Sequence, residues 1–221
     1  MYDCNNWRRA ADFMAPLGLA MLAMGLVACS REAPPHPAWD FARLDATGAE
    51  MAQDVALQHS CVRDGRTGLL WEVKQAEPGL HYQNDLYTWY SSDASSNGGE
   101  PGVADGGRCG LPPCDTESFV EAVNAAGLCG RNDWRMPSRD ELLTLVDQRR
   151  IGKGPTMDPD YFPGTVAAEY WAGTSFTMYP QGAWVVDTMY AHDRVDGKTE
   201  AKRVRLVSGS KTAVRPKGRG R

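Results

Sequence analysis

The chain opens with a segment that predicts export from the cytosol, and export constrains everything that folds after it. Arg8 and Arg9 supply positive charge, and the sixteen residues from Phe13 to Ala28 contain no charged side chain. That run is shorter than the roughly 20 residues that a membrane-spanning helix needs, but it suits the apolar region of a signal peptide. We therefore expect residues 1–28 to be removed and the mature protein to fold in an oxidising compartment.

The end of this segment predicts a lipid anchor. Leu26-Val27-Ala28-Cys29 is similar to a bacterial lipobox, in which the cysteine becomes the first mature residue and its thiol carries diacylglycerol. The alternative is a plain secretory peptide cut before Cys29, which would leave an incidental thiol. We expect lipidation at Cys29, and Ser30 after it is typical of outer-membrane lipoproteins. The predicted location is the cell envelope, at the outer membrane, facing the periplasm or the cell surface.

Cysteine usage in the mature chain predicts two disulfides. Removal of Cys4 and lipidation of Cys29 leave four of the six cysteines, and three pairings of four are possible. The tight Gly-Leu-Pro-Pro spacing favours one local bridge, and the other pair would then join the start of the domain to its middle. Histidines are scattered singly, which argues against zinc, and we expect no metal and no other cofactor. The favoured pairs are Cys109–Cys114 and Cys61–Cys129.

The mature chain divides into a tether, a body and a tail. Residues 29–60 are interpreted as a tether and N-terminal extension, because three prolines between residues 30 and 38 predict a stiff spacer. The body covers residues 61–208. Residues 209–221 are a basic tail, interpreted as disordered. No internal repeat and no glycine-rich phosphate-binding motif occurs in the sequence.

Within the body, the order of periodic segments predicts an α+β fold. A strand pattern at 68–73 precedes a long polar loop at 91–113 and two helices with clear start signals. The first helix is capped by Asp115 or Thr116 and ends at Gly127, and Ser138 to Glu141 form a capping box for the second. The order excludes a Rossmann or barrel architecture and predicts a small antiparallel sheet, two helices and long loops.

The C-terminal part of the body returns to strand patterns. Residues 169–176 and 183–187 predict a hairpin joined through 179–182. In the last pattern, 203–207, alternation places Val204 and Leu206 inward and both Arg203 and Arg205 outward. Trp71 and Trp171 lie in apolar strand patterns and are expected in the core.

Five blocks of the body occur in a characteristic order: 61–72, 87–90, 127–138, 161–163 and 170–175. They include Cys61-Val62-Arg63-Asp64-Gly65 and Asp133-Trp134-Arg135-Met136-Pro137. Together they resemble the Lcl C-terminal domain family. The resemblance implies a C-type-lectin-like fold related to formylglycine-generating enzymes, and an exported protein. The namesake domain belongs to a collagen-like surface adhesin that binds sulfated polysaccharides, so the resemblance also implies adhesion or recognition.

Two groups of residues are candidates for ligand binding. Asp133, Trp134 and Arg135 could hold a sugar or a carboxylate, with Arg135 as a bidentate donor; the favoured alternative is structural, with Trp134 in the core. Tyr87, Trp89 and Tyr90 border the long polar loop, and they are candidates for an exposed aromatic surface. A catalytic site is not expected, because no cysteine follows Cys129 and no nucleophile–base motif occurs.

Charge adds one hint about partners. The net charge is −4, but eight Lys and Arg and no acid occur from Lys202 onward, while Asp and Glu outnumber Lys and Arg by 26 to 14 between Cys29 and Ala201. A basic end can attract anionic polysaccharide, lipid headgroups or nucleic acid, and nucleic acid is the least expected for an exported protein. The leading hypothesis is a lipid-anchored, non-catalytic domain that recognises an anionic glycan or an envelope protein. The alternatives are a structural or assembly subunit of an envelope complex and, third, an enzyme related to the formylglycine-generating fold.

Overall fold

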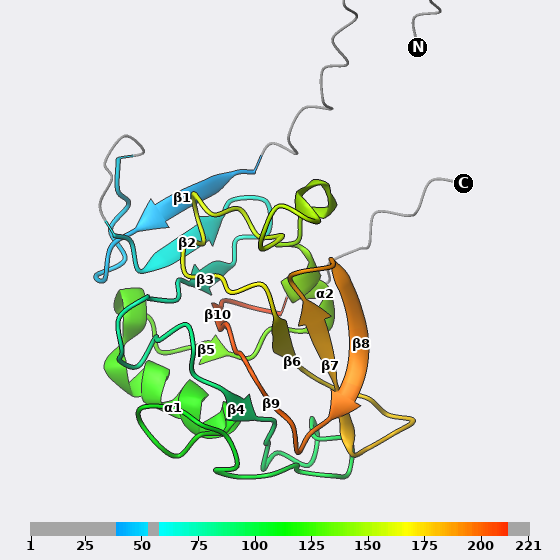
Figure 1. Ribbon diagram of the computed structural model, residues 1–221. Coiled ribbons are helices and arrows are strands. Elements are labelled where there is room, and N and C mark those ends of the chain that lie inside the picture. Colours follow the sequence, from blue (N-terminus) through cyan, green and yellow to red (C-terminus); the bar gives the residue numbers. More distant parts are fainter. Residues whose placement is uncertain (1–38, 53–57, 212–221) are drawn as a thin grey trace, which may run out of the picture. The chain divides into compact units, whose positions relative to one another are not determined.

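The computed structural model describes residues 39–52 and 58–211. The signal segment, Cys29 and the basic tail from residue 212 lie outside this part of the chain. The described residues form two α-helices and three antiparallel sheets of five, two and three strands, joined by long loops (Figure 1). The predicted α+β class, with two helices, is confirmed. No helix in this part of the chain has the length and apolar character needed to cross a bilayer.

The five-stranded sheet runs in the order β1-β2-β3-β10-β5, so strands from both ends of the body meet in it. The strand β1 lies before residue 61, where the sequence predicted the body to begin. It pairs with β2 from Phe41 opposite Asp64 to Leu44 opposite Cys61, so the compact unit starts earlier. The strands are β1 (Phe41–Leu44), β2 (Cys61–Asp64), β3 (Leu70–Glu72), β10 (Val207–Ser208) and β5 (Trp134–Arg135).

Both helices begin where their caps predicted. In α1 (Thr116–Ala126) the Asp115 carboxylate accepts a hydrogen bond from the Ser118 N–H at 2.9 Å, and Gly127 ends the helix in the left-handed region. In α2 (Arg139–Leu143) the capping box between Ser138 and Glu141 is complete. Short 3-10 turns follow the two helices at Leu128–Gly130 and Gln148–Arg150.

The other two sheets hold the C-terminal half of the body beside the helices. The predicted hairpin is present as β6 (Glu169–Ser175) and β7 (Gly182–Asp187). A third strand, β8 (His192–Gly197), completes this sheet; its charged sequence carries no apolar alternation, which is why the pattern did not reveal it. The two-stranded sheet pairs β4 (Tyr87–Thr88) with β9 (Ala201–Lys202).

Two disulfides fix the body, and they are the favoured pairs. Cys61 bridges Cys129 across 68 residues and ties β2 to the turn after α1, while Cys109 bridges Cys114 at the end of the long loop. Trp71 and Trp171 are fully buried in the core, as expected. The Cys61–Cys129 bridge therefore joins the five-stranded sheet to the end of α1, and the Cys109–Cys114 bridge closes a short loop that has no helix or strand.

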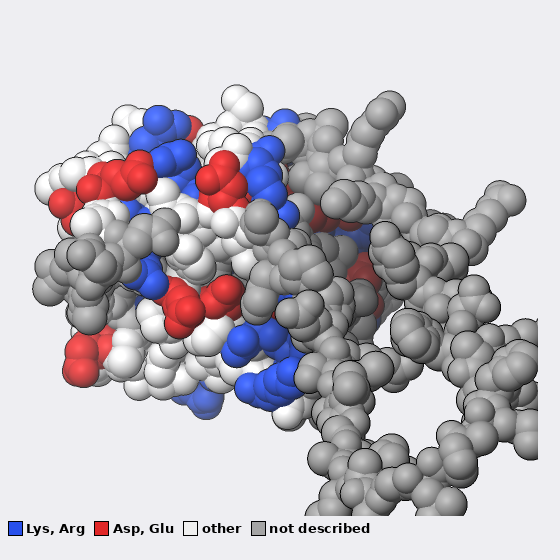
Figure 2. All heavy atoms as spheres, turned by 90° about the horizontal axis from the view of Figure 1, so that it is seen from above, with Lys and Arg blue, Asp and Glu red and all other residues white. Residues whose placement is uncertain are grey.

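The expected outward placement of Arg205 is wrong. Residues 203–206 lie between β9 and β10 and do not alternate, and the Arg205 side chain is fully buried. Its guanidinium donates to the Glu72 carbonyl oxygen and, at 3.0 Å, to the Thr165 hydroxyl. Lys202 is also buried and pairs with Glu169 and Asp196. The basic end of the body is therefore partly built into the fold, and on the face seen in Figure 2 basic and acidic side chains lie next to one another.

Candidate functional site

A groove of about 420 Å³ lies along the first half of α1. The chain after β4 forms one wall, α1 forms the second, and the end of β5 closes it. We call this the α1 groove, and three residues predicted as ligand-binding line it: Trp89, Tyr90 and Arg135. Its charged and aromatic lining residues are Trp89, Tyr90, Asp93, Glu117, Glu121, Arg135 and Lys211.

Side-chain hydrogen bonds fix the wall that follows β4 against α1. The Thr116 hydroxyl accepts from the Tyr90 N–H at 2.9 Å and donates to the Tyr90 carbonyl oxygen at 2.8 Å. The next residue of the helix, Glu117, accepts through its carboxylate from both the N–H and the hydroxyl of Ser92, each at 2.6 Å. The first turn of the helix therefore fixes the backbone of Tyr90, because both its N–H and its carbonyl oxygen are hydrogen-bonded to Thr116.

The groove is lined by two basic residues, Arg135 and Lys211, but the charge of Arg135 is already paired within the fold. Arg135 donates two 2.8 Å hydrogen bonds to the buried carboxylate of Glu141, and two further donors go to the carbonyl oxygens of Gly209 and Met136. Its charge is thus neutralised by a carboxylate within the fold. The lining also contains three carboxylates, those of Asp93, Glu117 and Glu121, and one further basic residue, Lys211.

The aromatic surface expected from Tyr87, Trp89 and Tyr90 is wrong for two of the three. Tyr87 and Trp89 are buried, at 3% and 2% exposure, because β4 carries them into the core beside Phe119. Burial, with Asp85 nearby, raises the pKa of the Tyr87 hydroxyl. Trp89 and Tyr90 both line the groove, and Tyr90, which is half-buried, is the more accessible of the two to a ligand.

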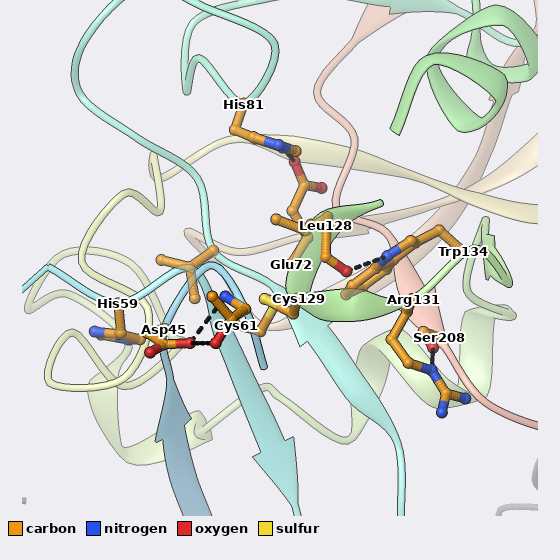
Figure 3. Close-up of a disulfide and its surroundings, with 12 residues drawn as sticks. Asp45, His59, Cys61, Glu72, His81, Leu128, Cys129, Arg131, Trp134 and Ser208 are labelled. Atoms are coloured by element: carbon orange, nitrogen blue, oxygen red, sulfur yellow. Dashed lines mark hydrogen bonds and ion pairs between the residues drawn. A yellow bond between two sulfur atoms is a disulfide. The ribbon is translucent and has the colours of Figure 1, made fainter. Parts of the chain in front are cut away.

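The segment at 133–135 has the structural role that was the favoured alternative. Trp134 is in the core, and its indole N–H donates to the Leu128 carbonyl oxygen at 3.0 Å beside the Cys61–Cys129 bridge (Figure 3). Asp133 accepts from Arg131 and Ser208, and these hydrogen bonds lower the pKa of its carboxyl to about 2. Asp133 and Arg135 therefore have separate partners within the fold.

The sequence did not reveal a cluster of charged side chains inside the body. We call Glu72, Lys74, His81 and Arg205 the polar core. The Glu72 carboxylate, fully buried, accepts from Lys74 and His81 at 2.9 Å and from the Leu206 N–H at 2.9 Å. Burial alone would raise the pKa of Glu72, but Lys74 and His81 outweigh it and lower that pKa to about 2. Burial lowers the pKa of Lys74.

A second pocket, of about 580 Å³, lies beside the segment that follows β3. Its lining includes the polar side chains of Arg43, His59, Gln75 and Asp160, and none of its described lining residues is Phe, Tyr or Trp. His59 donates to the Tyr161 carbonyl oxygen at 2.7 Å, and burial lowers its pKa. Within residues 39–52 and 58–211, no group of three or more His, Cys, Asp or Glu side chains is placed to hold a metal ion.

Comparisons with known proteins give one result. No curated protein and no solved structure matches the chain, so the C-type-lectin-like relationship stays a prediction. The family model described as the Lcl C-terminal domain matches residues 60–208, most of the chain and nearly the whole described body. The chain therefore belongs to the Lcl C-terminal domain family.

Proposed function

We propose that the protein is a lipid-anchored envelope protein whose domain binds a glycan, without catalysis, in the α1 groove. The observation that carries this proposal is the arrangement around Tyr90, where one aromatic ring is held beside three carboxylates in an open groove. Ligand sites typically combine an apolar or aromatic surface with a few fixed polar groups. None of the described lining residues of the second pocket is Phe, Tyr or Trp, so the α1 groove suits a sugar ring better.

The chemistry of the lining fits a hydroxyl-rich ligand. The aliphatic face of a pyranose can pack on the Tyr90 ring, and its hydroxyl groups can donate to the carboxylates of Glu117 and Glu121. Among described residues, no hydrogen bond or ion pair engages Glu121, which is exposed on α1. Its carboxylate is available to a ligand, whereas the Arg135 guanidinium is largely occupied.

An anionic glycan in the α1 groove would also use the basic residues at the C-terminal end of the chain. Lys211 lines the groove, and four further basic residues follow it: Arg215, Lys217, Arg219 and Arg221. Attraction between these charges and sulfate groups would be sensitive to salt, whereas packing on Tyr90 would not. A sulfated chain lying in the α1 groove would therefore combine a salt-dependent and a salt-independent contribution to binding.

The test is retention of the mature protein, purified in detergent, on neutral and sulfated glycans at two salt concentrations. We expect retention on at least one glycan, and a loss of about tenfold or more for Tyr90→Ala, which corresponds to about 1.4 kcal/mol. Tyr190→Ala is the matched control, because Tyr190 is 57% exposed and lies in the turn between β7 and β8. Absence of retention on every glycan would overturn the proposal, as would equal losses for the two variants.

The lipid anchor is tested separately. Cys29→Ala is expected to abolish partitioning into a detergent phase and to block globomycin-sensitive processing. Unchanged partitioning of this variant would contradict lipidation, although glycan binding by the domain could still be measured.

A second candidate function is that of an assembly subunit of an envelope complex. Met178 and Tyr179, in the turn between β6 and β7, are 84% and 50% exposed, and large exposed apolar side chains favour a protein contact. Chemical crosslinking in cells followed by purification tests it. A specific partner is expected to be lost with Met178→Ser; crosslinks that this substitution leaves unchanged would count against the candidate.

A further inference from the structure

Lys198 is buried, and the hydrogen-bond acceptors of its ammonium are backbone carbonyl oxygens. The residue lies between β8 and β9, and only 1% of its surface is exposed. Its ammonium donates to the backbone carbonyl oxygens of Asn97 at 2.8 Å and Glu100 at 2.5 Å, and it lies 4.1 Å from the centre of the Trp89 ring. Among the described residues, no carboxylate forms an ion pair with it. Burial lowers the pKa of Lys198.

This environment is a cation-binding cradle made by the long loop. Burying an ammonium is costly unless its N–H groups and its charge are satisfied. Here two peptide carbonyl groups and one aromatic face contact the ammonium, and the charge of Glu100 also favours it without forming an ion pair. Carbonyl oxygens that converge on one point repel each other unless a cation lies between them. We therefore expect the Lys198 ammonium to stabilise this conformation of the loop.

The cradle belongs to the same small loop that forms a wall of the α1 groove. The Ser91 N–H donates to the Pro101 carbonyl oxygen at 2.9 Å and closes the segment 91–101. Inside it, the Asn97 side chain donates to the Ser91 carbonyl oxygen at 3.2 Å, and the Asp93 carbonyl oxygen accepts from the Asn97 N–H at 3.0 Å. Asn97 thus connects the cradle directly to Ser91 and Asp93, which both line the groove.

Trp89 forms a second connection between the cradle and the groove. The Lys198 ammonium lies over its ring, the residue also lines the groove, and its backbone N–H donates to the Lys198 carbonyl oxygen at 3.2 Å. The indole N–H donates to the Ala172 carbonyl oxygen at 2.9 Å, which fixes the ring. Lys198 therefore contacts a lining residue of the groove twice, through its carbonyl oxygen and through its ammonium.

We propose that Lys198 is a positioning residue of the ligand site. Its ammonium is a built-in cation around which residues 91–101 fold, and it holds the wall that carries Ser91 and Asp93. The groove is then shaped without any added metal ion. The part of this inference that concerns binding rests on the proposed function; the part that concerns the loop does not.

The main test is hydrogen exchange of the mature protein without ligand. Lys198→Ala is expected to speed exchange at least tenfold in residues 91–101 while the five-stranded sheet stays protected. Propylammonium restores the missing methylenes and charge, so it is expected to restore protection, whereas propanol at equal concentration is not. Lys153→Ala is the matched control, because Lys153 is exposed and its truncation should leave exchange in the loop unchanged. Wild-type exchange rates in the loop of Lys198→Ala, or equal rescue by propanol, would overturn the inference.

Two further measurements separate this inference from the proposed function. In the wild-type protein, EDTA is expected to leave hydrogen exchange in residues 91–101 unchanged. Faster exchange of this loop in EDTA would overturn the inference that Lys198 takes the place of a metal ion, even if the variant fails to fold. Glycan retention is expected to fall about tenfold in Lys198→Ala and to return with propylammonium. If wild-type protein binds no glycan, the proposed function fails, while the exchange data still decide the role of Lys198.

Discussion

The polar core and the α1 groove contain the same types of charged side chain in opposite situations. In the polar core, Glu72 is fully buried and each of its oxygens has at least one donor. In the groove, Glu121 is exposed, and no described residue engages it. Charges that are buried and paired are part of the fold, because removing one partner leaves the other without compensation. Charges that are exposed and unpaired cost little and remain available to a ligand.

The same distinction applies to the basic residues near the C-terminus, three of which have partners within the fold. Arg205 lies in the polar core, Lys202 pairs with two carboxylates, and Arg203 donates to the Gln83 carbonyl oxygen. These three side chains join the C-terminal strands to the rest of the body. The excess of positive charge in the sequence is therefore divided between a structural role up to Arg205 and the segment from Lys211 onward.

The largest effect is expected for Glu72→Gln. The substitution removes the carboxylate that compensates the buried Lys74, so the free energy of unfolding should fall by about 3–5 kcal/mol. Denaturant unfolding measures it. Glu50→Gln is the control, because its pair with Arg63 is exposed and should be worth no more than about 1 kcal/mol. Equal losses for the two variants would remove the distinction between buried and exposed charges.

Acid should destabilise the protein through the same carboxylate. The pKa of Glu72 is about 2 in the folded state and near 4.5 when exposed, so its stabilisation is present above pH 4.5 and is lost as the pH falls toward 2. The loss should be on the order of 3 kcal/mol. Unfolding measured from pH 6 to pH 2 should show a steep decrease in wild-type protein and a shallower one in Glu72→Gln. Parallel curves would show that other carboxyls dominate.

A smaller effect is expected for Asp133→Asn, which lies between the two extremes. Asp133 is hydrogen-bonded to Arg131 and Ser208, but its side chain is 46% exposed, so solvent screens the interaction. We expect thermal unfolding to report a loss of about 1 kcal/mol or less. A loss as large as that of Glu72→Gln would mean that partner number, and not burial, sets the cost.

The smallest effect on stability is expected for Glu121→Gln in the groove. Because no described residue depends on this carboxylate, the free energy of unfolding should change by less than about 0.5 kcal/mol. Glycan retention should nevertheless decrease, since Gln offers one neutral acceptor in place of a charged one. Loss of stability together with binding would make Glu121 a structural residue and weaken the groove as a ligand site.

Local signals in the sequence were sufficient for the helices, the disulfides and most of the C-terminal sheet. Asp115, Gly127 and the Ser138–Glu141 capping box mark helix ends through contacts within a few residues, so spacing alone reveals them. The same holds for the hairpin of β6 and β7, where apolar residues and a turn are adjacent in the chain. By contrast, β8 has charged residues and no alternation, and β1 lies in a segment interpreted as a tether.

The sequence by itself determined the α+β class, the capped helices and the family, because each depends on residues that are close in the chain or in a fixed order, while export and lipidation stay predictions. Only the tertiary structure decided which charges are buried. Arg205 meets the Glu72 carbonyl oxygen across 133 residues, and Lys198 meets Asn97 across 101. Such contacts have no local pattern, since burial of a charge depends on a partner brought from elsewhere by the fold. For the same reason, alternation placed Arg205 outside and the long polar loop suggested three exposed aromatic rings where the structure leaves only Tyr90.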